Sequence, residues 1–452
     1  MEWIYICLLV AFVIVMFTIV KRPMYEIIFM AFVLMCLITG KITSIGTYLV
    51  NAADTYLLFS ITVFMAFSLI LEETGAISDM IDIIISVVGR FSGGAGYVAL
   101  VASAAMGALC GSAPGNAAAI GVIAIPSMKK TGFSPELAAT VEMAASALGP
   151  VIPPSGAIVI LYSILESLYP GQYSFSQFWL LAWVISFWYL LHRFVTLFFL
   201  IRKHKVAPIP KEDRPPLHLA LKRGWRSLFL PIIIFVPFLL DALCKETLIT
   251  NRLGAVAAAS FTNILLIIVP SIATVFALHL YVKAGNKISV KKYFHLFKGK
   301  ASNIAPIIVM AYAGFALTEL FTDAGIADGM GASIASIDFP LWFVAIVVPL
   351  VFTFLGMFME PTSLIMIFGS IFITLATSVG IHPMLGAMLV NVMTCALAPM
   401  TPPFALCLFV CIGIAESDFK KTSLLSVVWC VGHYLLAVLM LFGLIPMFGT
   451  LV

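Results

Sequence analysis

Residues 148–154 read Leu-Gly-Pro-Val-Ile-Pro-Pro, and a related heptapeptide, Leu-Ala-Pro-Met-Thr-Pro-Pro, follows 249 positions later at residues 397–403. Each heptapeptide lies inside a long apolar stretch, 134–169 or 383–415. Proline has no backbone N–H and clashes with the preceding helical turn, so paired prolines break a helix and leave carbonyl oxygens without helical partners. In a membrane such carbonyls persist only where protein buries them or where they line a cavity. We predict two broken helices whose ends face an ion or a polar solute, with simple structural kinks as the alternative.

Two further pairs of short segments recur at nearly the same offset. Residues 73–75 (Glu-Thr-Gly) are matched 250 positions later by residues 323–325 (Asp-Ala-Gly). Residues 132–135 (Gly-Phe-Ser-Pro) are matched 248 positions later by residues 380–383 (Gly-Ile-His-Pro). Three matches in the same order at an almost constant offset indicate an internal duplication.

The composition places most of this chain in a lipid bilayer. Of its 452 residues, 62% are hydrophobic and 10% are charged, against roughly 25% charged in an ordinary soluble domain. This composition excludes an ordinary soluble domain and a disordered chain. The apolar runs are continuous, which favours helices over a β-barrel. The net charge of +4 is small, and the eight cysteines lie almost wholly in apolar runs without the spacing of a disulfide or zinc framework.

Eight apolar segments are candidate spanning helices, because about 20 apolar residues cross a bilayer. They are 3–20, 24–40, 53–71, 176–200, 228–243, 254–282, 302–320 and 423–446. We expect the first to be retained rather than cleaved, since no small-residue cleavage site follows it. Two longer runs, 94–128 and 340–378, carry Gly, Pro or Ser at their centres and are predicted to be re-entrant hairpins. Residues 76–90 are amphipathic and are predicted to form a helix along the membrane surface, with a short spanning helix as the alternative.

The positions of Lys and Arg support the two hairpins. If neither hairpin crosses the membrane, every major basic cluster falls on one side, which the positive-inside rule makes cytoplasmic. These clusters are Lys21–Arg22, Lys129–Lys130, Arg202–Lys205, Lys287–Lys300 and Lys420–Lys421. Both termini are then expected to be extracytoplasmic. The two copies of the repeat have opposite orientations, as in many secondary transporters.

The predicted fold class is therefore an all-α polytopic membrane protein with inverted-topology repeats, two re-entrant hairpins and two proline-broken helices. We expect four regions. Residues 1–52 form N-terminal scaffold helices, residues 53–200 form repeat 1, residues 201–301 form a basic cytoplasmic linker with connecting scaffold helices, and residues 302–452 form repeat 2. Each repeat contains a scaffold helix, an arm helix, a hairpin, a broken helix and a return helix.

The predicted hairpin tips carry polar residues in the middle of apolar sequence. The first tip, residues 111–116, reads Gly-Ser-Ala-Pro-Gly-Asn, and the second, residues 356–363, reads Gly-Met-Phe-Met-Glu-Pro-Thr-Ser. Glu360 is an ionisable residue at membrane depth and hence a candidate functional residue, unless its carboxylate only binds the amides of its own tip. Hard cations prefer oxygen ligands, so carbonyl and hydroxyl groups here suit sodium. Weaker candidates, equally explained by helix–helix hydrogen bonds, are Glu142, Ser146, Asn391 and Thr394.

Several of these segments together resemble the DctM-like large membrane subunit of tripartite ATP-independent periplasmic (TRAP) transporters. They are GALCGSAPGNAAAIGVIAIPSMKKTGFSPELAA, ALGPVIPPSG, GMFMEPTSLI, GIHPMLGAMLVNV and APMTPPFALCLFV. The resemblance implies a sodium-driven importer of the inner membrane that works by an elevator movement. It also implies a small four-helix membrane subunit and an extracytoplasmic substrate-binding protein as partners. The implied substrate is an organic acid or an acidic sugar. Sodium is the coupling ion, and no prosthetic cofactor is implied.

The resemblance carries site residues over by motif. One sodium site would be framed by Ser112, Asn116, Pro153, Pro154 and Ser155. The other would be framed by Gly356, Glu360, Thr362, Thr401, Pro402 and Pro403. The substrate would lie between the tips, against Asn116, Thr401 and Asn391. The chain departs from the commoner family residues at Pro114-Gly115, at Glu360-Pro361 and at Phe404.

Two other classes of protein remain as alternatives. A stand-alone sodium- or proton-coupled carrier of di- or tricarboxylates would transport without a soluble receptor. A membrane-embedded enzyme is disfavoured, because the sequence has neither an HExxH motif nor a GxSxG motif. A lone intramembrane glutamate also does not provide paired acid–base chemistry. We therefore expect no enzymatic activity.

Overall fold

A computed structural model of the chain describes residues 2–110, 113–153, 155–326, 329, 333, 336–337, 339–356, 361–401 and 405–451. Within these residues the regular secondary structure is helical. Six helical segments of the described chain are long and apolar enough to cross a membrane, or eight if each of two bent pairs is one span. Large apolar side chains point outward from these segments, among them Leu424 (74% exposed), Val275 (66%) and Phe199 (65%). Lipid is the solvent that suits such a surface, and the chain is a multi-pass membrane protein.

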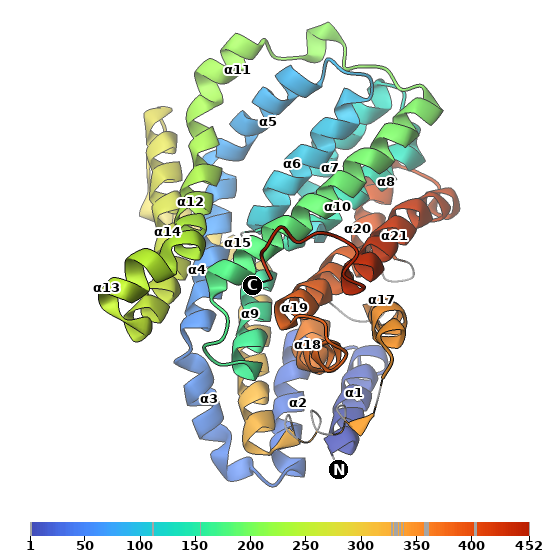
Figure 1. Ribbon diagram of the computed structural model, residues 1–452. Helices are drawn as coiled ribbons and strands as arrows, with labels where there is room; N and C mark the ends of the chain where they lie inside the picture. The colour runs from blue at the N-terminus through green and yellow to red at the C-terminus, as the bar shows by residue number, and fades with distance from the viewer. Residues whose placement is uncertain are drawn as a thin grey trace.

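The N-terminal helices pack around one long helix from the second half of the chain. The helices α1 (Glu2–Thr18), α2 (Met24–Ile38) and α3 (Ile45–Ala53) lie at one end of the molecule (Figure 1). Both α2 and α3 pack against α15 (Val290–Asp323). This contact has its own apolar core, in which residues of α2 meet Ala313, Leu317 and Leu320 of α15.

The two predicted scaffold helices, α4 (Tyr56–Thr74) and α15, run in opposite directions beside each other. At the end of α4, Glu73 forms an ion pair of 2.5 Å with Lys292 at the beginning of α15. Beyond the other end of α4, the hydroxyl of Tyr48 in α3 donates to Asp323 at the end of α15 (2.5 Å). This antiparallel arrangement supports the predicted opposite orientation of the two repeats, which remains a prediction.

The helices α5 (Ala76–Val88) and α10 (Phe175–His204) belong to the first predicted repeat. The chain between the two predicted repeats contains α11 (Leu217–Gly224), α12 (Phe229–Cys244), a π-helical turn η5 (Lys245–Thr250), α13 (Asn251–Leu253) and α14 (Ala255–Lys283). The predicted arm helix 76–90 is α5, which turns away from α4 at Gly75, where φ is +72°. It packs on α11, and Asp79 pairs with Arg223 at 2.8 Å. Its position along a membrane surface remains a prediction.

The first predicted hairpin consists of α6 (Gly94–Cys110) and α7 (Ala113–Lys130), which lie side by side (Figure 1). Its two ends are both hydrogen-bonded to residue Ala207 of the linker. The Gly93 amide donates to the Ala207 carbonyl (3.3 Å), and the Ala207 amide donates to the Thr131 carbonyl (2.9 Å). The hairpin therefore begins and ends at the same end of the molecule, as a re-entrant segment requires.

The second repeat has less regular helices than the first. Its hairpin comprises a π-helical turn η6 (Phe343–Val347), α17 (Val348–Gly356) and α18 (Pro361–Ser378). It is followed by α19 (Pro383–Asn391), α20 (Leu406–Ala415) and α21 (Phe419–Leu441). One expectation differs from the structure: part of the basic cluster Lys287–Lys300 is helical, because α15 begins at Val290 and extends well before the predicted apolar segment at 302. Ser289 caps this start by accepting from the Lys292 amide.

Candidate functional site

The first heptapeptide breaks a helix where the prolines predict it. The helix α8 (Pro135–Ala147) is capped by Ser134 and is buried from Leu137 to its last residue. A 3-10 turn, η2 (Gly149–Val151), follows, and the chain then becomes extended at Ile152. It resumes as α9 (Gly156–Leu168) after Ser155, whose hydroxyl accepts from the Ala157 amide (3.3 Å). The two halves are inclined by 42°. We call residues 148–155 break 1.

The second heptapeptide interrupts a helix in a different way. From Asn391, α19 widens into a π-helical turn, η7 (Val392–Leu397), and then tightens into a 3-10 turn, η8 (Ala398–Met400). Thr401 is extended, with φ −100° and ψ 120°, and its hydroxyl donates to the Ala398 carbonyl (3.0 Å). The next helix, α20, begins at Leu406. We call residues 397–405 break 2.

Each hairpin touches the break of its own repeat at an equivalent pair of residues. A Cβ atom added to Gly107 in α6 would lie 2.5 Å from the Cα of Gly149 in η2. A Cβ atom added to Gly356 in α17 would lie less than 3.0 Å from the Cβ of Ala398 in η8. Gly356 and Ala398 each follow Gly107 and Gly149 by 249 positions. The same close approach of hairpin and break therefore occurs twice, at the offset of the duplication.

Polar side chains of the first hairpin meet α8 in a fully buried cluster. Asn116, in the first turn of α7, donates from Nδ2 to the Ser103 carbonyl (2.7 Å) and the Ser146 carbonyl (3.4 Å). The hydroxyls of Ser103 and Ser146 donate to Glu142 Oε1 at 2.7 and 2.6 Å. Asn116 was a predicted site residue. Glu142 and Ser146 were weaker candidates, because sequence spacing does not reveal that α6 and α7 bring partners to them. We call these four residues the Glu142 cluster.

The carbonyls of break 1 are bound by side chains from two other helices. Asn391, at the end of α19, donates from Nδ2 to the Pro150 carbonyl (3.2 Å). Ser186 of α10 donates to the Val151 carbonyl (3.0 Å). The freed carbonyls are thus buried by protein in this conformation. Of the predicted substrate residues, Asn391 thus binds break 1 from the other repeat, whereas Asn116 binds carbonyls of α6 and of α8 just before the break.

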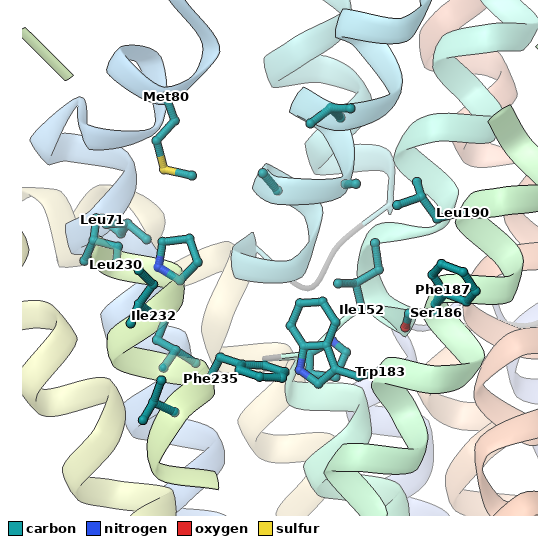
Figure 2. Close-up of a pocket in the computed structure, with 17 residues that line it drawn as sticks. Leu71, Met80, Ile152, Trp183, Ser186, Phe187, Leu190, Leu230, Ile232 and Phe235 are labelled. Atoms are coloured by element: carbon teal, nitrogen blue, oxygen red, sulfur yellow. The ribbon is translucent and has the colours of Figure 1, made fainter. Parts of the chain in front are cut away.

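An apolar cavity of about 520 Å³ lies beside break 1 (Figure 2). Ile152 and Pro153 form part of its wall, and Trp183, Phe187 and other apolar side chains of α10 and α12 form much of the rest. Pro153, which was predicted to frame a sodium site, therefore faces an apolar space here. Among the described residues that line this cavity, Ser186 contributes a hydroxyl, which already donates to the Val151 carbonyl, and the rest of the wall is largely apolar.

Five of the predicted site residues lie outside the described residues: Ser112, Pro154, Glu360, Pro402 and Pro403. Gly356 is the last residue of α17, and Thr362 lies in the first turn of α18. Asn116, Asn391, Ser155 and Thr401 are buried.

Sequence reasoning missed one buried cation that joins the two repeats. Arg193, in the middle of α10, is fully buried. It donates from Nε to the Ala144 carbonyl of α8 (3.2 Å), and its Nη2 lies 2.8 Å from Nδ1 of His433 in α21. His433 Nε2 in turn lies 3.2 Å from the Val392 carbonyl of η7. A single arginine within an apolar span was the available signal, since such residues face a bundle interior.

The site therefore has the parts of a membrane transporter. Two discontinuous helices face two helical hairpins, and buried amide and hydroxyl groups line the contact, which is the general arrangement of secondary transporters. Among the described residues, no group of three or more His, Cys, Asp or Glu side chains could hold a metal ion. Hydroxyl, amide and carbonyl oxygens are instead the ligands that suit a hard monovalent cation.

The chain belongs to the DctM component family of the tripartite ATP-independent periplasmic transporters, whose family model matches residues 4–448. It is 26% identical over 391 residues to the C4-dicarboxylate TRAP transporter large permease protein DctM of Pseudomonas aeruginosa, with 86% of this chain and 84% of that protein covered. It is 23% identical over 393 residues to the sialic acid TRAP transporter large permease protein SiaM of Vibrio cholerae, with the same coverage.

The fold is also similar to a solved structure. The YdaH transporter of Alcanivorax borkumensis aligns with a TM-score of 0.64 and 17% identity over 90% of both chains. At this identity the likeness concerns the fold alone.

Family membership confirms the resemblance found in the sequence. The protein is a secondary transporter subunit and not an enzyme, and permeases of this family need no prosthetic cofactor. The family implies a small membrane subunit and a substrate-binding protein as partners.

Proposed function

We propose that this chain is the large transmembrane subunit of a sodium-coupled importer of a small anionic metabolite in the inner membrane. A substrate-binding protein delivers the cargo, a carboxylate or an acidic sugar. The two relatives are named for C4-dicarboxylates and for sialic acid, both of which are acids. An elevator movement carries the hairpins and broken helices against the scaffold formed by the remaining helices.

The observation that carries this proposal is the repeated contact of hairpin and break. Gly107 meets Gly149 in one repeat, and Gly356 meets Ala398 in the other. Because each hairpin rests on its break with almost no side chain between them, hairpin and break form one packed unit in each repeat. Two such units, joined through the bond from Asn391 to the Pro150 carbonyl, form a body that moves as a whole.

We place the two sodium sites at these contacts. The first lies among Asn116, Ser155 and the carbonyls of break 1, with Ser112, Pro153 and Pro154 beside it. The second lies among Gly356, Thr362 and Thr401, with Glu360, Pro402 and Pro403 beside it. The Oδ1 atoms of Asn116 and Asn391 are buried and accept no hydrogen bond from the described part of the chain. An amide oxygen in that state suits a cation or a polar substrate. The substrate lies between the tips, against Asn116, Thr401 and Asn391.

Uptake into proteoliposomes tests the proposal. The chain is reconstituted with its small membrane subunit, and the binding protein is supplied outside with a radiolabelled C4-dicarboxylate or with sialic acid. We expect uptake only with the binding protein and an inward sodium gradient. Equal uptake with potassium in place of sodium would overturn the sodium coupling. Uptake without the binding protein would instead show a stand-alone carrier.

A further inference from the structure

Glu142 is a buried carboxyl group that the proposed sodium sites do not use. It lies in the middle of α8 with none of its surface exposed. Both hydroxyls that contact it, those of Ser103 and Ser146, donate to Oε1. Its second oxygen, Oε2, has no hydrogen-bond partner within the described residues. One of the two carboxyl oxygens therefore accepts no hydrogen bond from the described residues, although a buried carboxylate normally accepts several.

No basic side chain in the described part of the chain forms an ion pair with Glu142. On α10, Arg193 directs its guanidinium to the Ala144 carbonyl, His192 and His433. On α7, Lys129 binds the Ala415 carbonyl at the far end of the helix. The elements packed against α8 carry further titratable groups: Tyr97 on α6, Lys130 on α7, Tyr189, Arg202, Lys203 and His204 on α10, Cys395 in η7, Cys407 and Cys411 on α20, and Lys420, Lys421, Cys430 and Tyr434 on α21. The basic groups among them lie in the last turns of α7 and α10 or the first turn of α21, away from the middle of α8. None of these thiols supplies a positive charge.

An ionised Glu142 would thus be an uncompensated charge at membrane depth. Removing a carboxylate from water without a counter-ion costs several kcal/mol in real proteins, and such groups in spanning segments are rare and functional. A proton on Oε2 removes the charge. It also turns the unpartnered acceptor Oε2 into a hydrogen-bond donor.

The second repeat supports a neutral group at this position. Asn391 follows Glu142 by 249 positions, the offset of the duplication, and is likewise fully buried near the end of its helix segment. Its neutral amide donates to the Pro150 carbonyl (3.2 Å). A protonated carboxyl resembles an amide in having one donor side and one acceptor side. The same place in the fold therefore holds a neutral amide in one repeat, and a carboxyl group in the other.

We propose that the Glu142 cluster is a proton-binding site: Glu142 carries a proton in this conformation and releases it when the contact between the hairpin and α8 opens locally to water. Ser103 and Asn116 belong to the hairpin, while Glu142 and Ser146 belong to α8. A local opening of this contact, separate from the joint elevator movement of hairpin and broken helix, therefore removes a hydrogen bond to Oε1. One proton then passes from Oε2 to water, and no other bond changes. Proton binding and hairpin closure favour each other by linkage. The link to transport rests on the proposed function, whereas the protonation itself does not.

Infrared spectroscopy of the purified protein in detergent at neutral pH tests the protonation without any substrate. The spectrum of the wild type minus that of Glu142→Gln should contain the C=O stretch of a protonated carboxyl group. The matched control is Glu166→Gln, because Glu166 in α9 is only partly buried and accepts from the Gly171 amide (3.0 Å). Its difference spectrum should show ionised carboxylate bands instead. Carboxylate bands for Glu142 as well would overturn the proposal.

A second variant covers the case in which Glu142→Gln does not fold. Ser146→Ala removes one donor to Oε1 and should shift the frequency of the protonated carboxyl band of the intact protein. An unshifted band in folded Ser146→Ala would assign that band to another residue and would contradict the proposal.

The coupling to transport is tested in the proteoliposomes described above, with a fixed sodium gradient and varied pH. Wild-type uptake should depend on pH, and Glu142→Gln should lose that dependence. An infrared band combined with pH-independent wild-type uptake would show a structural proton and overturn the coupling. Failure of sodium to drive uptake would count against the proposed function alone, because the infrared result does not depend on it.

Discussion

The two breaks occupy equivalent places in the chain but are stabilised by different groups. In break 1 a regular helix ends in a 3-10 turn, and the freed carbonyls of Pro150 and Val151 are bound by Asn391 and Ser186. Before break 2 the helix widens into the π-helical turn η7, and His433 binds the carbonyl of Val392 in that turn. The residue that contacts the hairpin is Gly149 in break 1 and Ala398 in break 2.

The two breaks therefore share a backbone plan and differ in the side chains that support it. Each break needs donors for its freed carbonyls, and any buried amide, hydroxyl or imidazole in the right place provides one. The partners come from the opposite repeat or from a return helix, so each break depends on the rest of the fold. The following variants test this dependence.

The largest loss of stability is expected for Arg193→Ala, because Arg193 contacts elements of both repeats. The change leaves the Ala144 carbonyl without that donor and opens a cavity between α8, α10 and α21. Large-to-small changes in a core cost about 2–5 kcal/mol, and an unsatisfied buried acceptor adds about 1–3 kcal/mol. Thermal unfolding of the purified protein measures the effect.

The matched control for Arg193 is Arg202→Ala in the last turn of the same helix. Arg202 is exposed and lies 4.2 Å from the ring centroid of Phe198. Such a contact contributes about 0.5–1 kcal/mol at an exposed site. Similar unfolding temperatures for the two variants would show that Arg193 does not join the repeats.

An added methyl group should destabilise the protein by different amounts at the two hairpin–break contacts. Gly107→Ala places its Cβ against the backbone of Gly149, whereas Gly356→Ala places it against the side chain of Ala398. Overpacking costs about 1–3 kcal/mol, and we expect Gly107→Ala to lie at the upper end because a backbone atom has less room to move. Unfolding temperature and sodium-driven uptake provide the readouts.

A compensating change sharpens this comparison. The double variant Gly356→Ala with Ala398→Gly moves the methyl group from one side of the contact to the other and should recover most of the lost stability. No such exchange exists at the first contact, where both residues are glycine. Absence of recovery would mean that the second hairpin does not rest on break 2 as described.

Removing a hydrogen-bond donor to break 1 should cause an intermediate loss of stability. Asn391→Ala leaves the Pro150 carbonyl without its donor, and Ser186→Ala does the same for Val151. Each unsatisfied buried carbonyl costs about 1–3 kcal/mol. We expect the larger loss for Asn391, because its side chain is bigger and links the two repeats. Wild-type stability of both variants would show that water replaces these donors at no cost.

The smallest change in stability is expected for Thr401→Ala. The Thr401 hydroxyl donates to the nearby Ala398 carbonyl, and losing one such bond costs about 0.5–1.5 kcal/mol. Sodium should nevertheless stimulate uptake less, because we place this hydroxyl in the second sodium site. Thr353→Ala in α17, whose hydroxyl bonds to the Pro349 carbonyl (2.8 Å), is the control. Equal sodium dependence in both variants would remove Thr401 from the site.

Much of the fold and part of the site could be predicted from the sequence. The broken helix at Pro150 and the hairpin around residue 111 follow from local rules about proline, glycine and apolar length. Asn116 was predicted to be a site residue, and the structure shows its amide buried and bonded to the Ser103 and Ser146 carbonyls, although its role in a site stays a prediction. The π-helical turn at Val392 was not predicted, because nothing in the local sequence separates it from an α-helix.

The sequence by itself determined that this chain is a multi-pass membrane protein and where its helices break, because these depend on properties of neighbouring residues; the duplicated plan stays a prediction. Only the tertiary structure decided that Asn391 binds the Pro150 carbonyl across 241 positions, and that Arg193 reaches His433 across 240. Many buried donors and acceptors are chemically equivalent, so local sequence does not select among them. Helix packing makes that selection by bringing one donor within reach of each freed carbonyl.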